Sequence, residues 1–276
     1  MRKRVFSILL SIAVCLSMMP VGAWADITGE GGTAKQSSNV AEVKIGDTVT
    51  QYTDITDAFT AAQKADSAEV KLLNNAEITT TKDSDGKEIL KGIDLAKGNI
   101  TLDLNGKNLS GKQTSVESAA SDSILFNVCD PCTFTVKDSA SGGAIVQSNS
   151  VAAIRAAAES KVIIDSGTIE NTSSQDQTEN CAVFVIGSSN VTINGGTIKG
   201  AYKGIYVDSW NSDATLTATG NPQIHGEKSN ALLVGKAKSV TLSGGTFTTN
   251  ETGNHSIWNS SGTAESLLAD GYRYED

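Results

Sequence analysis

Basic side chains are scarce in this sequence of 276 residues. It contains 22 Lys and Arg and 2 His against 31 Asp and Glu, and its formal net charge is −9 at neutral pH. Nucleic acids and anionic membrane surfaces are bound by proteins with a basic face. The composition therefore argues against both as partners, and the two histidines, His225 and His255, leave few general bases for catalysis.

Long hydrophobic runs are missing except at the N-terminus. Three basic residues precede an apolar run that reaches Met19, and small residues end the segment at Ala25. Residues 1–25 are therefore predicted to be a secretory signal peptide. A lipoprotein, cleaved before Cys15, is disfavoured because the preceding valine is not small. No later stretch approaches the roughly 20 apolar residues of a membrane span, so we expect a secreted, extracellular protein without membrane insertion that can associate with a cell surface.

Proline is also rare, with 3 residues, whereas Thr, Ser, Asn, Gly and β-branched residues are frequent. This composition is typical of a strand-rich protein rather than a disordered one. Removal of the signal peptide takes three basic residues and no acidic one, so the mature chain has a net charge of about −12. Its arginines are then Arg155 and Arg273.

A repeated unit accounts for most of the chain. The segment "NVTINGGTIKG" at 190–200 joins an alternating apolar strand, a polar turn and a second short strand. Similar segments occur at 100–111, 134–148, 161–172, 214–226 and 239–250. The second strand of each copy carries one large apolar residue, and these residues are Leu109, Ile145, Ile169, Ile198, Ile224 and Phe247.

Another short strand precedes most units, and the last one follows the final unit. These strands align on one apolar position, occupied by Ile124, Ile154, Val183, Ile205, Leu232 and Ile257. Three strands in each repeat of 22–30 residues describe a parallel β-helix, whose coils share one apolar core. Because the strict hexapeptide rhythm of left-handed forms is absent, we predict an all-β, right-handed parallel β-helix of about six to seven coils over residues 81–262.

Two further columns follow from this alignment. Because side chains alternate along a strand, the next position should face outward, and it is occupied by Leu125, Arg155, Phe184, Tyr206, Leu233 and Trp258. The turns within the units should also stack, because Asn, Asp and Gly tolerate the left-handed backbone of a tight corner. The expected corner residues are Asn105, Asp138, Asp165, Asn194 and Ser243.

Residues 41–80 are predicted to cap the first coil with a hairpin that turns at Gly46 and Asp47, an α-helix and a strand. The helix should begin after Asp54 as its N-cap. Its expected apolar face holds Ile55, Ala58, Phe59 and Ala62. The remaining segments are a flexible leader at 26–40, an exposed hairpin or loop around Asp85 and Gly86, and an end segment at 263–276.

The order of these segments resembles a known family. "YTDITDAFTAAQ", "AEVKLLNNAEI", "ITLDLNGKNLSG" and the "VTINGGTI" coils are similar to pectin-lyase-like right-handed β-helix domains of secreted and cell-surface proteins of Gram-positive bacteria. The resemblance covers roughly residues 41–276, and "SLLADGYRYED" resembles the segment that ends such domains. It implies the fold, but this fold hosts both polysaccharide-degrading enzymes and non-catalytic adhesive modules.

Glycine-rich segments do not predict a cofactor. "GKNLSGK" at 106–112 has P-loop spacing, but Gln113 stands where a metal-binding Ser or Thr is required. "NGGTIKG" lacks the spacing of the dinucleotide fingerprint, and no Ca²⁺-binding nonapeptide occurs in the sequence. The coil-turn interpretation is therefore favoured for both segments.

Three cysteines follow the signal peptide. Cys129 and Cys132, in "CDPC", are predicted to lie at a corner between two strands, where a local disulfide fits an exported chain. Free buried thiols are the alternative. Cys181 is then left as a small apolar residue or as a partner for one of the pair.

Carboxylates are the candidates for an enzymatic site, because glycosidases pair acidic residues and lyases combine Ca²⁺-binding acids with a base. Asp208 is expected beside the outward column, but its aligned neighbours are Ile186 and Gly235. Arg155 has no acidic neighbour in its own aligned column. We therefore assign no catalytic and no metal-binding residue, and a polysaccharide lyase or glycoside hydrolase is the alternative function.

Aromatic residues of the outward column form the candidate ligand-binding site. Sugar rings stack on aromatic faces, and a rigid stripe of them can hold an extended polysaccharide. The candidate residues are Phe184, Tyr202, Tyr206, Trp210 and Trp258, together with Arg155 and Asp208. The competing interpretation is that the connection at 171–180 or a neighbouring domain covers them.

These observations predict a secreted, non-catalytic module for surface recognition or adhesion. Its partner would be an extracellular glycan or a host or cell-surface protein, because exposed apolar stripes also bind proteins. A structural spacer without a ligand is the second alternative.

Overall fold

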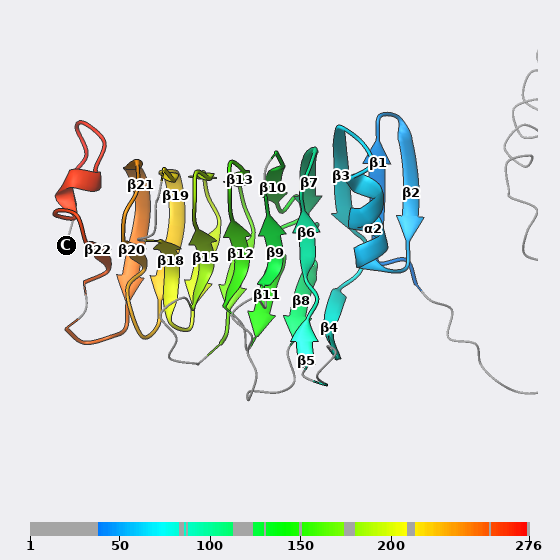
Figure 1. Cartoon of the computed structure of the whole chain (residues 1–276), viewed down its shortest axis with the longest axis horizontal. Helices are drawn as coiled ribbons and strands as arrows, with labels where there is room; N and C mark the ends of the chain where they lie inside the picture. The colour runs from blue at the N-terminus through cyan, green and yellow to red at the C-terminus, as the bar shows by residue number, and fades with distance from the viewer. Residues whose placement is uncertain are drawn as a thin grey trace, which may run out of the picture. The chain divides into compact units, whose positions relative to one another are not determined.

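A computed structural model describes residues 38–274, except 83–85, 87, 113–123, 130, 149–150, 174–179, 209–212 and 254. The predicted signal peptide and nearly all of the predicted leader lie outside the described residues. Trp210 does as well. The described part is a stack of β-strands with an antiparallel hairpin and a helix at one end and a short 3₁₀ helix at the other (Figure 1).

The N-terminal end has the predicted hairpin and helix. Strands β1 (Ala41–Ile45) and β2 (Thr48–Tyr52) pair antiparallel around a turn at Gly46, whose φ is +58°. Helix α2 (Ile55–Ala62) follows, and the Asp54 carboxylate accepts hydrogen bonds from the backbone N–H groups of Thr56 and Asp57. All four predicted apolar residues of this helix are buried.

Helix α2 closes the core of the first coils. Its Phe59 ring lies edge-on against Phe126 and Phe134, at centroid distances of 5.3 Å and 6.5 Å. Phe126 and Phe134 in turn stack on each other at 4.9 Å. The helix therefore covers apolar side chains that the stack would otherwise present to water at this end.

The coils form three sheet faces, which we call A, B and C. Face A contains β3 (Ser67–Leu72), β7 (Asn99–Asp103), β10 (Thr133–Lys137), β13 (Lys161–Ile164), β16 (Asn190–Ile193) and the first halves of β19 (Thr215–Gly226) and β21 (Ser239–Thr249). Face B contains β4 (Ala76–Lys82), β8 (Asn108–Lys112), β11 (Ala144–Ser148), β14 (Thr168–Asn171), β17 (Thr197–Gly200) and the second halves of β19 and β21. Face C contains β6 (Ile93–Leu95), β9 (Ile124–Val128), β12 (Ala152–Ala156), β15 (Cys181–Val185), β18 (Lys203–Val207), β20 (Leu232–Val234) and β22 (Ile257–Asn259).

Neighbouring strands within each face are parallel, which confirms the predicted parallel β-helix. Faces A and B are continuous where β19 and β21 bend through the corner, with a shift in their pairing register between Gly220 and Gln223. Strand β5 (Glu88–Leu90) is an exception, because it pairs antiparallel with β4 as the hairpin expected near Gly86. Strands β3 and β4 already pair in parallel with β7 and β8. The parallel stack therefore begins before residue 81, the predicted start of the β-helix.

The apolar column predicted on face B is confirmed over its whole length. Its residues are register partners from coil to coil: Leu109, Ile145, Ile169, Ile198, Ile224 and Phe247. The first five are buried, whereas Phe247, on the last coil, is only partly buried. Each side chain thus packs on an equivalent one of the next coil until the stack ends.

The column predicted on face C is wrong at its first position. Phe126, and not Ile124, pairs with Ile154, and it continues to Ile93 on the preceding coil. Ile124 pairs instead with Ala152. The alternating apolar pattern fits either residue, but in the structure Phe126 lies in the main core whereas Ile124 lies in a separate apolar cluster.

The corner column is correct only in part. The amide of Asn194 donates to the Asp165 carboxylate over 2.7 Å, so these two side chains stack as expected. Asp103, however, pairs with Lys137, which leaves Asn105 and Asp138 displaced from the column. The corners before β8 and β11 are longer than those before β14 and β17, and this difference shifts their polar residues.

The segment at 263–274 covers part of the last coil. It contains the 3₁₀ helix η2 (Glu265–Leu267), and Leu267 is buried. Leu268 forms a parallel bridge with Leu242 of β21, and the Ala269 N–H donates to the Leu242 carbonyl over 2.9 Å. The end segment is therefore attached to the stack along face A.

Candidate functional site

The outward column of face C has a polar half at its N-terminal side. The corrected register places Asp94, Asn127 and Arg155 side by side on β6, β9 and β12. The Asn127 amide donates to Asp94 over 2.8 Å, and Arg155 Nε donates to Asn127 over 3.0 Å. Arg155 is therefore linked through Asn127 to an acidic residue of its own column, contrary to the sequence alignment. Leu125, which that alignment placed outward, is fully buried.

The aromatic residues that continue this column are not an exposed stripe. Phe184 is 5% exposed and Tyr206 is 7% exposed, and their rings stack at 5.3 Å with an interplanar angle of 11°. They belong to a second apolar cluster with Ile124, Val151, Ala152 and Cys181, separate from the main core. The prediction of an open aromatic surface at these two positions is wrong, because this cluster buries both rings.

Two other candidate residues, Tyr202 and Asp208, lie next to this second cluster. The Lys203 ammonium lies 4.3 Å from the ring centroid of Tyr202 and 5.6 Å from that of Tyr206. The Tyr206 hydroxyl donates to Asp208 over 3.3 Å. Lys203 is only 4% exposed, and its ammonium lies over the faces of both rings in a cation–π arrangement. Tyr202 and Asp208, two of the predicted ligand-binding residues, therefore lie next to the buried side chains of Lys203 and Tyr206.

Trp258 is the one described aromatic of the predicted stripe that is largely exposed. It is 48% exposed on β22, at the C-terminal end of face C. The His255 ring stacks on it at 6.1 Å with an interplanar angle of 24°. Among the described aromatic residues of this column, a largely exposed ring therefore occurs only on β22, the last strand of face C.

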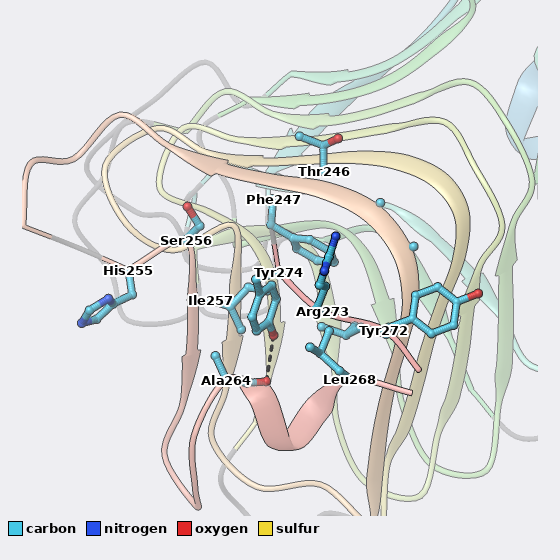
Figure 2. A pocket seen from close by; sticks show the side chains of 13 residues that line it. Thr246, Phe247, His255, Ser256, Ile257, Ala264, Leu268, Tyr272, Arg273 and Tyr274 are labelled. Atoms are coloured by element: carbon cyan, nitrogen blue, oxygen red, sulfur yellow. Dashed lines mark hydrogen bonds between the residues drawn. The ribbon is translucent and has the colours of Figure 1, made fainter. Parts of the chain in front are cut away.

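A cavity of about 620 Å³ opens at this same end, between β21 and the end segment (Figure 2). Its aromatic lining residues are Phe247, Tyr272 and Tyr274. Thr246, Ser256 and Arg273 add polar groups. Figure 2 shows Phe247, Ile257, Arg273 and Tyr274 gathered at its centre, with His255 and Tyr272 at opposite sides.

The described residues that line the cavity carry basic groups. In a chain of net charge −9, they include Arg273 and His255, and none of these described lining residues is Asp or Glu. Glu265 lies close by, and its carboxylate accepts hydrogen bonds from its own backbone N–H and from Thr263, which lower its pKa. The cavity therefore combines apolar ring faces with a cationic side chain.

Tyr274 fixes the end segment at the cavity. Its hydroxyl donates to the Ala264 carbonyl over 2.7 Å (Figure 2). Burial, followed by the negative charge of Glu265, raises the pKa of Tyr274 to about 12. The phenol is therefore a neutral donor at any physiological pH.

A second polar arrangement lies on the outer side of face B. His225 Nδ1 is 2.8 Å from Thr248 Oγ1, and His225 Nε2 is 3.1 Å from Glu227 Oε2. A hydrogen bond from Asn250 and then one from His225 lower the pKa of Glu227. Because the carboxylate accepts from Nε2–H, the neutral imidazole presents Nδ1 as an acceptor to the Thr248 hydroxyl. The Thr248 hydroxyl, the His225 imidazole and the Glu227 carboxylate are thus arranged like a nucleophile, its general base and the acidic residue that orients the base.

The carboxylates of the first corners support the backbone. Asp138 accepts from the N–H groups of Gly106 and Gly143, each over 2.7 Å, and Asp103 accepts from Asn105 and Ser139. These bonds satisfy corner N–H groups that have no strand partner. Within the described ranges, no three His, Cys, Asp or Glu side chains are grouped as metal ligands.

The cysteines are three free thiols in the structure, at 129, 132 and 181. The Cys132 N–H donates to the Cys129 carbonyl over 2.9 Å, which closes a tight turn between β9 and β10. Burial and then the charge of Cys129 raise the pKa of the Cys132 thiol to about 11. The disulfide between Cys129 and Cys132 stays a prediction.

Sequence reasoning missed the cavity because its residues come from separate segments. Phe247 was assigned to the core column, and Tyr272, Arg273 and Tyr274 to the end segment. The available signal was "GYRY", which places two tyrosines and one of the two arginines that follow the predicted signal peptide within three residues. A tertiary contact, the bridge between Leu242 and Leu268, brings that segment next to Phe247.

Among the described residues, no helix has the length and apolar composition needed to cross a membrane. Comparison of the chain with protein-family models, curated proteins and solved structures found no match.

Proposed function

We propose that this protein is a secreted, non-catalytic recognition or adhesion module that binds an extracellular glycan in its C-terminal cavity. The observation that carries the proposal is the cavity of about 620 Å³ lined by Phe247, Tyr272, Arg273 and Tyr274. Tyr272 is 52% exposed and Tyr274 is 38% exposed, so both rings are accessible to a ligand.

The chemistry of the lining suits a sugar. Aromatic rings stack on the C–H faces of pyranose rings, and a few convergent polar groups then select the orientation. Thr246, Ser256 and Arg273 supply such groups at the cavity. The glycan site is therefore proposed at the end of the stack and not in the middle of face C, where Phe184 and Tyr206 are buried.

A glycan-binding screen of the mature chain, residues 26–276, tests this proposal. We expect Tyr272→Ala and Phe247→Ala each to weaken binding of a captured oligosaccharide at least tenfold, about 1.4 kcal/mol, while the circular dichroism spectrum is unchanged. Trp258→Ala is the matched control, because it removes an aromatic of similar exposure that does not line the cavity.

The control also separates the competing sites. Loss of binding in Trp258→Ala but not in Tyr272→Ala would move the site to the outer side of face C. Absence of binding to every glycan in the screen would remove the proposal and favour the structural spacer.

A second candidate function, ester hydrolysis, is favoured by the contacts of His225. Thr248 Oγ would attack an acyl carbonyl while His225 Nδ1 takes the hydroxyl proton and returns it to the leaving alcohol; water then cleaves the acyl-threonine and restores the hydroxyl. Release of nitrophenol from p-nitrophenyl acetate measures it. Turnover that is unchanged in Thr248→Ala would dismiss this candidate.

A further inference from the structure

Strand β2 is a free edge of the described sheet. It pairs with β1 on one side and has no described strand on the other, at the N-terminal end of the continuous sheet formed by faces A and B. All of its residues from Thr48 to Gln51 are exposed. A free edge presents a row of unpaired backbone donors and acceptors to any extended segment that approaches it.

The register shows which backbone groups point outward. A two-residue turn joins Ile45 to Thr48, so this pair exchanges both hydrogen bonds and every second pair does the same. Thr48, Thr50 and Tyr52 therefore bond to β1, whereas the N–H and C=O groups of Val49 and Gln51 point to the open edge. Among the described contacts at this edge, the side-chain oxygen of Gln51 accepts from the Asn39 amide.

This edge lacks the features that normally prevent pairing. Proteins protect free edges with Lys, Pro, a bulge or a covering segment. Strand β2, "TVTQY", contains neither Lys nor Pro, and its register with β1 is uninterrupted. Val49 is 51% exposed, and its register partner on β1 is Lys44. At the opposite end, by contrast, the bridge between Leu242 and Leu268 covers part of the last coil.

Charges at the ends of β2 indicate what can pair there. Asp47 precedes the strand and Asp54 follows it shortly after its last residue. Full antiparallel pairing of β2 with a second copy, centred on Thr50, would place Asp47 opposite Thr53 of that copy and next to its Asp54. Like charges so close oppose self-pairing, whereas basic residues at both ends of a strand would complement them.

We propose that β2 is a docking edge for a partner protein, which adds an extended, uncharged strand flanked by basic residues. Val49 and Gln51 supply the backbone hydrogen bonds of the new ladder. Val49 adds an apolar contact, and the two aspartates select the charge of the flanks. This interaction is independent of the proposed glycan site at the other end of the stack.

The probe is the acetylated heptapeptide Lys-Thr-Val-Thr-Val-Thr-Lys, compared with the same peptide carrying Glu at both ends. We expect fluorescence anisotropy to show binding of the lysine peptide to residues 26–276 at least tenfold tighter than that of the glutamate peptide. Hydrogen exchange should show slower exchange of the Val49 and Gln51 amides in the complex, with unchanged exchange at Thr50, which is already bonded to β1.

Two variants keep the test independent of folding. Val49→Pro removes an outward N–H without removing a bond to β1, and Val49→Lys places a charge at the edge; both should reduce peptide binding at least tenfold at unchanged melting temperature. Asn190→Lys is the matched control, because it adds the same charge on β16, a strand paired on both sides.

Three results would overturn the proposal. Equal binding of the two peptides would refute recognition of basic flanks. Slow exchange of Val49 and Gln51 in the free monomer would mean that another segment of this chain occupies the edge. A dimer in sedimentation analysis that Val49→Pro dissociates would show that the occupant is a second copy.

Discussion

The middle coils and the two ends of the β-helix differ in what they leave exposed. In the middle coils, an apolar side chain such as Ile169 contacts equivalent residues on both neighbouring coils and is fully buried. The largely exposed large apolar residues of the described chain all lie at the ends: Ile45, Val49, Trp258, Tyr272 and Tyr274. Each coil buries its apolar side chains against the neighbouring coils, so exposed apolar side chains remain at the ends of the stack.

The two ends also differ from each other. At the N-terminal end, helix α2 places Phe59 on the core and leaves a free strand edge. At the C-terminal end, the end segment bridges Leu242 and leaves a cavity beside Phe247. One end therefore offers backbone groups and the other offers aromatic side chains, which predicts partners of different chemistry.

Truncation of the buried core should have the largest effect on stability. Phe126→Ala removes a fully buried ring that contacts two others, and we expect a loss of about 3–5 kcal/mol in the free energy of unfolding. Tyr272→Ala, at the exposed end, should cost within about 0.5 kcal/mol. Urea denaturation measures both, and similar losses for the two variants would contradict the comparison.

The corner between β9 and β10 should give the next largest effect if its disulfide forms on export. We expect denatured, unreduced protein to show one reactive thiol, that of Cys181. Reduction should then lower stability by about 2 kcal/mol, the entropy of closing a short loop. Three reactive thiols would refute the disulfide and leave Cys129 and Cys132 as reduced residues of the corner.

The stability of the N-terminal end should depend on the N-cap of helix α2. Asp54→Ala removes the acceptor for the N–H groups of Thr56 and Asp57, and we expect a loss of about 1 kcal/mol. Hydrogen exchange should accelerate first in α2 and the hairpin. Asp47→Ala, which removes an acidic residue of the hairpin turn, is the control, and an equal loss there would show that charge rather than capping is responsible.

The smallest expected effect on stability comes from the titration of Tyr274 at alkaline pH, at the C-terminal end. The pKa of Tyr274 is raised to about 12, above its ordinary value of 10.0. Its contribution to stability is therefore complete below about pH 10 and is lost as the pH rises towards 12. Absorbance at 295 nm should show that Tyr274→Phe removes the component that titrates near pH 12; removal of a component near pH 10 would contradict the raised pKa of this phenol.

Short-range patterns were sufficient to predict much of this molecule. The helical spacing of Ile55, Ala58, Phe59 and Ala62 predicted the buried face of α2, and Asp54 predicted its start. The alternation in each copy of the repeat predicted the face B column, because each copy places one large residue after a similar turn. These features depend on residues within a few positions of each other.

Register and exposure were harder to predict. Ile124 and Phe126 fit the same alternation, so only the pairing with Ile154 distinguishes them. Phe184 and Tyr206 were predicted as an exposed stripe because the pattern marks them as outward, yet both lie in a second apolar cluster on that side. Outward on a strand is not the same as exposed to solvent, since other segments can cover the outer side of a sheet.

The sequence alone determined that this chain is a parallel β-helix with a helix at its N-terminal end, because periodicity and capping are local and repeat from coil to coil. The tertiary structure alone decided which aromatic side chains remain accessible. Tyr206 is buried in mid-stack, whereas Tyr272 and Tyr274 are exposed in the end segment, where no described strand packs beyond the last coil.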